Sequence, residues 1–347
     1  MRIAHVIAGA PMGGAEVFFE RLALAQHRAG EAVLAVIRSD AARAARLAAG
    51  GLDAVQLPFG GPFDLRTGPA LRAALARFRP DAVVSWANRA SRFAGRLRRR
   101  GAPWPLAGRM GGYYDLKYYR GCDAVIGNTE DIRDWVVARG WPAGRAHYVP
   151  NFAADLAGAV PAALPAPPGA RRLLALGRLH PNKGFDILLR ALAELPEAHL
   201  SLAGEGPERP ALEALARALG LGPRLAFLGW RQDTGALLAA CEALVCPSRH
   251  EPLGNVVLEA WSAARPIVAA AAQGPAALIR PGETGLLVPK ENPAALAAAL
   301  RALLADPAQA AALAAAGRAE YAARHAEAPV LARWRDFLTA LVPQETA

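Results

Sequence analysis

Two carboxylates in the second half of the sequence stand where they could hold a sugar nucleotide. Glu251 and Glu259 are separated by seven residues, with a strand expected just before them over 243–246. The residues between the two carboxylates include two that can open a helix, Gly254 and Asn255. The amino end of a helix offers free N–H groups and positive potential to a diphosphate. The flanking carboxylates can accept hydrogen bonds from sugar and ribose hydroxyls. Taken alone, each glutamate is equally consistent with an ordinary surface residue.

Two cations bracket a second loop that follows an expected strand. Arg178 and Lys183 lie in the run Gly177-Arg178-Leu179-His180-Pro181-Asn182-Lys183-Gly184. A planar guanidinium and a compact ammonium both suit phosphate oxygens. The sequence has no Asp-x-Asp pair, no HExxH and no Walker A run. We therefore expect no metal and no cofactor, with cations and helix amino ends neutralising a diphosphate leaving group. Two solvent-exposed charges beside a turn, without any binding role, would give the same sequence pattern.

The positive charge lies almost entirely in the first half. Residues 1–165 hold 22 basic and 13 acidic side chains, whereas residues 166–347 hold 18 and 17. Such asymmetry indicates an anionic partner, either an acidic acceptor, a phospholipid surface or nucleic acid, unless it reflects an arginine-rich surface alone. The basic residues are scattered and form no recognition motif, so nucleic acid is not predicted.

One basic cluster suits an anionic membrane surface. It consists of Arg89, Arg92, Arg96, Arg98, Arg99 and Arg100, with Trp86, Phe93 and Trp104 interleaved. Cations with aromatic neighbours favour the headgroup layer and also suit a phosphorylated glycolipid acceptor, although a solvated helix face would carry the same residues. Three cysteines without a CxxC pair indicate buried thiols in a reducing compartment, and no apolar run has the length of a membrane span. We expect a cytoplasmic protein, either soluble or peripheral at the inner face of the membrane.

The elements that must position these residues alternate between strands and helices. Apolar runs at 2–8, 32–37, 82–85 and 124–126 predict parallel strands in the first half, and a Pro-rich stretch precedes a second alternation. Strands are expected there at 173–176, 199–203, 225–228, 243–246, 266–269 and 285–288. The predicted fold class is α/β, with two doubly wound Rossmann-like domains and the ligand between them at the carboxyl ends of the strands. The predicted boundaries are 1–160 with a last helix over 329–347, a linker at 161–171, and 172–328.

In this order the motifs resemble the retaining glycosyltransferases of family 4, which have the GT-B fold. The resemblance covers essentially the whole chain and is tightest over 173–290. It is carried by Gly13-Gly14-Ala15-Glu16, the Arg178…Lys183 loop, Gly204-Glu205-Gly206-Pro207, Glu251 with Glu259, and Gly282-Glu283-Thr284-Gly285-Leu286-Leu287-Val288-Pro289. It implies two domains facing each other across a cleft. It also implies transfer of a sugar, with retention, from a nucleotide diphosphate, with UDP favoured over GDP, to a glycan or glycolipid.

The resemblance also implies roles for single residues. Arg178 and Lys183 would bind the diphosphate and share the catalytic role with Glu251, which would face the transferred sugar. Glu259 would bind the ribose. Further donor contacts would come from the amides of Gly254, Asn255 and Val256 and from the loop at Gly13 and Gly14.

The first half departs from the family pattern on the acceptor side. Many members carry a His after the strand that corresponds to 82–85, but here Trp86-Ala87-Asn88-Arg89 follows. The aromatic stretch from Arg109 to Tyr119 resembles members that assemble lipopolysaccharide or other surface glycans, and it is equally read as core. The acceptor-side candidates are Asn88, Arg89, Arg109, Tyr113 and Asp115. Two other functions stay open, a nucleotide-sugar epimerase or hydrolase with this fold and a non-catalytic nucleotide-sugar-binding protein.

Overall fold

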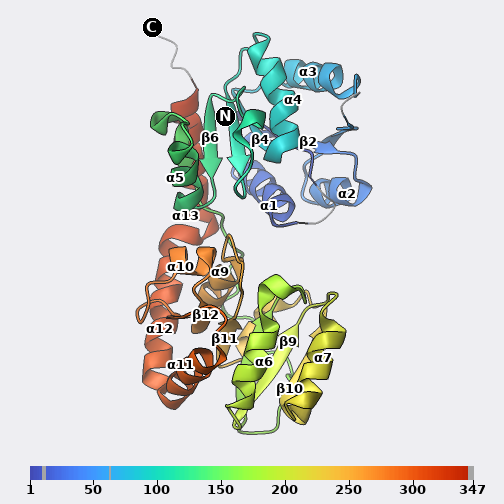
Figure 1. Cartoon of the computed structure of the whole chain (residues 1–347). Helices are drawn as coiled ribbons and strands as arrows, with labels where there is room; N and C mark the ends of the chain where they lie inside the picture. Colours follow the sequence, from blue (N-terminus) through green and yellow to red (C-terminus); the bar gives the residue numbers. More distant parts are fainter. Residues whose placement is uncertain (10–12, 62–63, 343–347) are drawn as a thin grey trace. The chain divides into compact units, whose positions relative to one another are not determined.

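The computed structural model describes residues 1–9, 13–61 and 64–342 (Figure 1). The chain forms two compact units. The first comprises Met1–Asn151 together with the stretch from Glu327 onward, and the second comprises Phe152–Ala326. The last helix, α13 (Glu327–Leu341), therefore belongs to the first unit although the second unit precedes it in the chain.

The first unit is built on a parallel sheet with strand order β3-β2-β1-β4-β5-β6-β7. Its strands are β1 (Arg2–Ile7), β2 (Ala32–Arg38), β3 (Ala54–Leu57), β4 (Ala82–Trp86), β5 (Leu106–Met110), β6 (Ala124–Gly127) and β7 (Ala146–Tyr148). Its other helices are α1 (Gly14–Arg28), α2 (Ala41–Ala49), α3 (Thr67–Phe78), α4 (Ala87–Arg99) and α5 (Glu130–Ala138). β1, β4, β5 and β6 are buried along almost their whole length, so they read as apolar runs rather than as alternating patterns.

The second unit repeats this design with strand order β10-β9-β8-β11-β12-β13, again all parallel. Its strands are β8 (Arg171–Leu176), β9 (Ala198–Ala203), β10 (Leu225–Gly229), β11 (Ala243–Cys246), β12 (Ile267–Ala270) and β13 (Leu286–Val288). Its helices are α6 (Phe185–Ala193), α7 (Arg209–Ala218), α8 (Thr234–Ala240), α9 (Asn255–Ser262), α10 (Gln273–Leu278), α11 (Pro293–Ala305) and α12 (Pro307–Glu320). In both units the strand order reverses beside the first strand, and ligands of such sheets bind outside the carboxyl ends of the strands at that point.

The two sheets confirm the predicted fold class. The sequence did not predict β3, β5 or β7. The division into units also differs from the expected boundaries, because residues 152–171 pack on the second unit. The Ala153 amide donates to the His325 carbonyl over 3.2 Å, and the Ala162 amide donates to the Ala236 carbonyl over 2.9 Å. Leu156 joins the apolar core there.

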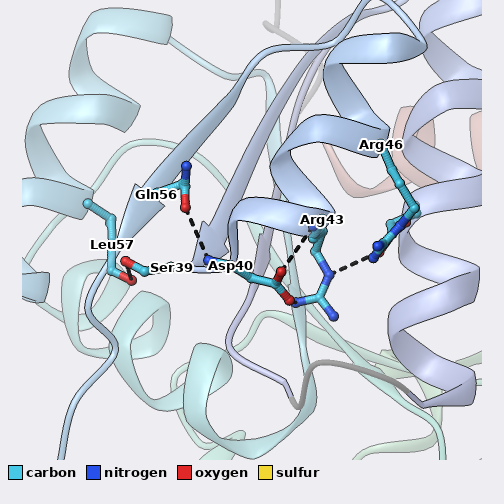
Figure 2. Close-up of polar contacts among 7 residues, drawn as sticks. Ser39, Asp40, Arg43, Arg46, Gln56 and Leu57 are labelled. Carbon is cyan, nitrogen blue, oxygen red and sulfur yellow. Dashed lines mark hydrogen bonds and ion pairs between the residues drawn. The ribbon is translucent and has the colours of Figure 1, made fainter.

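An ion network around the buried Arg43 fixes α2 against α1. The Arg43 side chain is 1% exposed and donates to Glu20 of α1 over 3.0 Å, and Arg46 binds the same carboxylate over 2.7 Å. Figure 2 shows Asp40 between Gln56, which accepts from the Asp40 amide, and Arg43. Asp40 also caps α2. The network holds in place the helix that follows Gly13.

α13 covers one face of the first sheet. Its indole, Trp334, stacks on Trp86 with ring centroids 6.4 Å apart, and Phe337 packs edge-on against His147 at 5.0 Å. Ion pairs hold the helix at its start, from Glu327 to Arg28 at 3.0 Å, and near its middle, from Arg335 to Glu31 at 3.1 Å.

Cys122, Cys241 and Cys246 are buried and unbridged, as expected. Burial raises the pKa of Cys122 and of Cys241 to about 12, so both thiols stay protonated. Among the described residues no single helix is long and apolar enough to cross a membrane. One pair of helices with a bend between them, Pro293–Ala305 and Pro307–Leu341, is long and apolar enough only when the two are taken together.

Candidate functional site

In the second unit, three loops converge at the carboxyl ends of β8, β9 and β11. The Leu179 amide donates to the Glu205 carbonyl over 2.9 Å, and the Asn182 carbonyl accepts from the amides of Arg249 and His250 over 2.8 and 3.1 Å. Gly184 has a φ of 63° and is the amino cap of α6, and a Cβ there would clash with the Pro247 carbonyl. The loop that carries Lys183 is therefore fastened to the loop that carries Glu251.

Lys183 and Glu251 form a direct ion pair at this edge of the sheet. The Glu251 side chain is 10% exposed and that of Lys183 is 28% exposed. Residues 68 positions apart thus meet at this edge, with an ammonium partly open to solvent and a carboxylate behind it. A phosphate that reaches Lys183 would compete with a carboxylate for the same cation.

Arg178 lies in the same loop with a different environment. Its side chain is exposed and has no hydrogen bond or ion pair to any residue that the structure describes. Arg249, which the sequence analysis did not single out, instead braces the loops. It donates to both oxygens of Asp186 over 2.7 and 2.8 Å and to the Pro181 carbonyl over 2.9 Å. Arg249 also holds the pKa of Asp186 below its ordinary value.

α9 begins where the sequence predicted, with Gly254 as its amino cap in the left-handed region. Asn255 is exposed at the first position of the helix, Val256 is half-buried, and the half-buried Glu259 lies one turn further. The Gly274 amide donates to the Glu251 carbonyl over 2.7 Å and closes the turn before the helix. The amino end of α9 and the Lys183–Glu251 pair therefore belong to one loop cluster.

In the first unit, Glu16 lies over the turn between β1 and α1. Its carboxylate fills the space that a Cβ at Gly9 or at Gly13 would take. Gly13 precedes α1 and Gly14 is its first residue, so the two glycines stand at a helix amino end. Residues 10–12 of this turn lie outside the described part of the chain.

Two amide side chains carry unpaired oxygens at the same edge of the first sheet. The Oδ1 atoms of Asn88, after β4, and of Asn128, after β6, are buried without a hydrogen-bond partner among the described residues. Ala87, before Asn88, has a φ of 58°, a conformation that costs energy in a residue other than glycine. Arg89 donates to the Phe59 carbonyl over 3.0 Å. Asn128 was missed, although a polar residue directly after a buried strand was a usable signal.

Tyr113 and Asp115 are exposed on the segment after β5. The Tyr113 hydroxyl donates to Asp131, and burial together with this carboxylate raises the pKa of Tyr113 to about 12. Asp115 pairs with Lys117 at 2.6 Å, and the hydrogen bond from Lys117 lowers the pKa of Asp115. Beside them the side chain of Tyr114 is half-buried near Gly111 and Asn128. Because their side chains are exposed, Tyr113 and Asp115 remain accessible to an acceptor.

Arg109, in contrast, is a core residue of β5 and is 3% exposed. Its guanidinium donates to the carbonyls of Gly127 and Val149 over 3.1 and 2.6 Å and to the Asn151 side chain over 2.7 Å. It also lies 5.3 Å from the Trp334 ring centroid. Burial lowers the pKa of Arg109 to about 9. The structure thus gives it a packing environment in place of the acceptor contact that we expected.

The basic cluster of α4 is also only partly as expected. Arg96, Arg99 and Arg100 are exposed, whereas Arg98 pairs with Asp123 at 2.8 Å. The three interleaved aromatic residues are buried at 2–7% exposure and cannot enter a headgroup layer: Trp86, Phe93 and Trp104. Within the described ranges, no group of three or more His, Cys, Asp or Glu side chains could hold a metal ion.

Two family models match this chain, one on each unit. "Glycosyl transferases group 1" matches residues 170–306, and "Glycosyl transferase 4-like domain" matches residues 13–151. The chain is 33% identical to the lipopolysaccharide core biosynthesis glycosyltransferase LpsE of Rhizobium meliloti, over 88% of this chain and 89% of that one. It is also 33% identical to LpsD of the same organism, over 97% and 98% of the two chains.

Solved structures share the fold. Anabaena Alr3699/HepE in complex with UDP has a TM-score of 0.86 at 21% identity, covering 98% of this chain and all of that one. The lipopolysaccharide outer core galactosyltransferase WaaB has a TM-score of 0.78 at 18% identity, covering 98% and 99%. At these identities the likeness shows the GT-B fold alone.

Proposed function

Because this chain belongs to the group 1 glycosyltransferases with a glycosyltransferase 4-like amino-terminal domain, we propose that it transfers a sugar from UDP to a lipopolysaccharide core or related surface glycan, with retention. The observation that carries the donor half of this proposal is the Lys183–Glu251 pair beside the amino end of α9. A cation and helix N–H groups can take the charge that develops on a departing diphosphate. The two relatives that match over most of the chain are lipopolysaccharide core biosynthesis glycosyltransferases, which supports the acceptor class.

The proposed division of roles follows the two units. In the second unit Lys183 and Arg178 bind the diphosphate, Glu259 binds the ribose, and Glu251 faces the transferred sugar. In the first unit, the buried amide oxygens of Asn88 and Asn128 are acceptors that lack donors, and sugar hydroxyls supply donors. Asn88 lies in the stretch after β4, the region in which many family members have a His, so we assign it to the acceptor side.

Solved relatives of this fold are described in complex with UDP and with UDP-glucose, which makes UDP the first nucleotide to test. Isothermal titration and thermal shift with UDP, GDP and ADP, each with and without EDTA, are the direct experiment. We expect UDP alone to raise the Tm by mass action, with no requirement for a divalent cation. Equal stabilisation by all three nucleotides, or a Tm shift that disappears in EDTA and returns with Mg²⁺, would contradict the donor assignment.

The acceptor and the stereochemistry need a second measurement. Incubation with UDP-glucose and a truncated lipopolysaccharide core oligosaccharide, followed by NMR of the product, reports both. An α-linked product from the α-linked donor is the expected result. A β-linked product would rule out retention, and release of free glucose without any transfer would favour a hydrolase.

We place the protein at the inner face of the cytoplasmic membrane through its basic first unit. Arg96, Arg99 and Arg100 are exposed near the end of α4, and each cation close to an anionic leaflet contributes about 1 kcal/mol. Co-sedimentation should rise with the fraction of anionic lipid and fall with salt, and the triple change to Glu should abolish it. Equal binding to neutral vesicles would remove the membrane from the proposal.

A further inference from the structure

The first unit contains a cavity of about 590 Å³ that the proposed reaction does not use. It lies between the carboxyl ends of α3 and α4, which run side by side (Figure 1), and the segments that lead into β4 and β5. Its walls are apolar and include Leu75, Ala76, Leu97 and the indole of Trp104. A volume of this order is within the range of small-molecule sites, roughly 300–1,000 Å³.

Three arginines surround this cavity. Arg72, Arg79 and Arg100 are exposed, and none has a hydrogen bond or ion pair from its side chain within the described ranges. No lining residue is acidic. Arg79 and Arg100 cap the carboxyl ends of α3 and α4, where the helix dipole favours cations. Arg72 lies in the middle of α3, so the dipole does not account for the third charge.

The lining decides which kind of anion fits. Apart from the arginines and the Trp104 N–H, its side chains are those of Leu, Ala and Pro, with Gly101 adding none. A sugar or a nucleobase needs several polar partners to replace its hydrogen bonds with water, and this cavity does not offer them. A molecule with an apolar chain and an anionic head fits both the apolar walls of the cavity and the three arginines around it.

We propose that this cavity binds one anionic phospholipid of the bilayer, with acyl-chain carbons against Leu75 and Trp104 and the phosphate at Arg72, Arg79 and Arg100. The inference deepens the proposed membrane contact and rests on it. The proposal assigns a defined ligand to one place on the basic surface of the first unit. The cavity is also separate from the acceptor candidates, because Asn88 lies at the other end of α4, about 20 Å away along a helix of this length.

The test uses a soluble probe, dihexanoyl phosphatidylglycerol below its micelle concentration, titrated into the full chain. Ala76→Trp fills the cavity and leaves every charge in place. The triple change of Arg72, Arg79 and Arg100 to Gln removes the charges and leaves the cavity. We expect each to weaken binding at least tenfold. The matched control changes three other exposed arginines of the first unit, Arg66, Arg77 and Arg120, to Gln and should bind within twofold of the wild type.

Three outcomes would overturn the site. Unchanged binding by Ala76→Trp, or equal binding of dihexanoyl phosphatidylcholine, would mean that the probe does not occupy the cavity as proposed. Absence of binding to the wild type would do the same. UDP affinity and Tm, measured on every variant, report folding and the donor site separately. A milder filling change, Ala76→Leu, tests the cavity if the Trp variant unfolds. Failure of the wild-type protein to bind UDP would count against the proposed function and not against this site.

Discussion

At the scale of single residues, the proposed donor site carries its own counter-ion. Lys183 is already paired with Glu251 before any ligand arrives, and a diphosphate must draw the ammonium toward itself. Arg178 has no described partner to give up. The two cations therefore differ in what nucleotide binding costs them, although the sequence presented them as a matched pair.

Lys183→Ala and Arg178→Ala should each weaken UDP binding. One charge-assisted hydrogen bond contributes about 1.5–3 kcal/mol, so each change should raise the Kd roughly 10- to 150-fold. Lys183→Ala should also lower the Tm, because it leaves the buried Glu251 carboxylate unpaired. Calorimetry with UDP measures the first effect and thermal unfolding the second. Arg190→Ala, an exposed arginine on α6, is the control. Unchanged UDP affinity in both variants would refute the assignment.

Glu251→Gln and Glu259→Gln should separate turnover from nucleotide affinity. Glu251→Gln frees Lys183 and removes a carboxylate from the sugar, so the Kd for UDP should stay within threefold while kcat falls at least a hundredfold. Glu259→Gln weakens the contact to the ribose, so the Kd for UDP should rise about tenfold. Titration with UDP and initial rates with UDP-glucose give both numbers. Identical behaviour of the two variants toward UDP would show that the roles are wrongly divided.

At the scale of elements, the contact between the start of α6 and the loop after β11 sets the geometry of the proposed donor site. Gly184→Ala should destabilise the fold by about 3 kcal/mol, from a left-handed backbone and an overlap with the Pro247 carbonyl. Gly220→Ala is a matched control, because Gly220 has a φ of 62° with open space around it and should cost only about 1 kcal/mol. Denaturant unfolding compares them, and UDP affinity should fall only for Gly184→Ala. Equal losses of unfolding free energy in the two variants would mean that the loop contact contributes nothing to stability.

The elements also show why the sequence predicted some strands and missed others. β8 and β11 are apolar runs followed by loop residues, and both were predicted. β5 reads Leu-Ala-Gly-Arg-Met, and its Gly and Arg indicate a loop when taken alone. Only the structure shows Arg109 satisfied by carbonyls of β6 and of the segment after β7. β7 has three residues at the edge of the sheet, too few to give a pattern.

The same distinction applies to the site. Lys183 and Glu251 were predictable because motifs place them at the ends of adjacent strands, β8 and β11. Arg249 acts through contacts with Pro181 and Asp186, which are distant in sequence, and such contacts leave no local spacing to recognise. The aromatic residues near the basic helix were misassigned for a related reason, since Trp86 and Trp104 have the composition of a membrane surface and the burial of a core.

At the scale of the whole molecule, the first unit depends on a neutral histidine in its centre. Trp86 Nε1 donates to His5 Nδ1 over 3.2 Å, so the proton of the imidazole lies on Nε2, which is 2.6 Å from Gln26 Oε1. A second proton would face the indole N–H. Burial lowers the pKa of His5 to about 4 against the Gln26 hydrogen bond, which raises it.

The stability of the protein should therefore fall between about pH 6.5 and pH 4. In that range the unfolded chain protonates His5 and the folded chain does not, so the free energy of unfolding decreases as pH falls. The full loss is about 3 kcal/mol for a shift of this size. Denaturant unfolding at several pH values should show this slope in the wild type and a smaller slope in His5→Gln. Parallel pH profiles of the two proteins would contradict the role of His5.

α13 has a consequence for how the chain is made. Glu31 and Arg335 are 304 positions apart, yet both belong to the first unit. During synthesis β1 and α1 leave the ribosome early, whereas Trp334, which covers Trp86, arrives only after the second unit has been translated. The second unit has its complete sequence before the first unit does. The amino-terminal unit is thus the last to finish folding, and until then the aromatic face beneath α13 is a surface that chaperones can recognise.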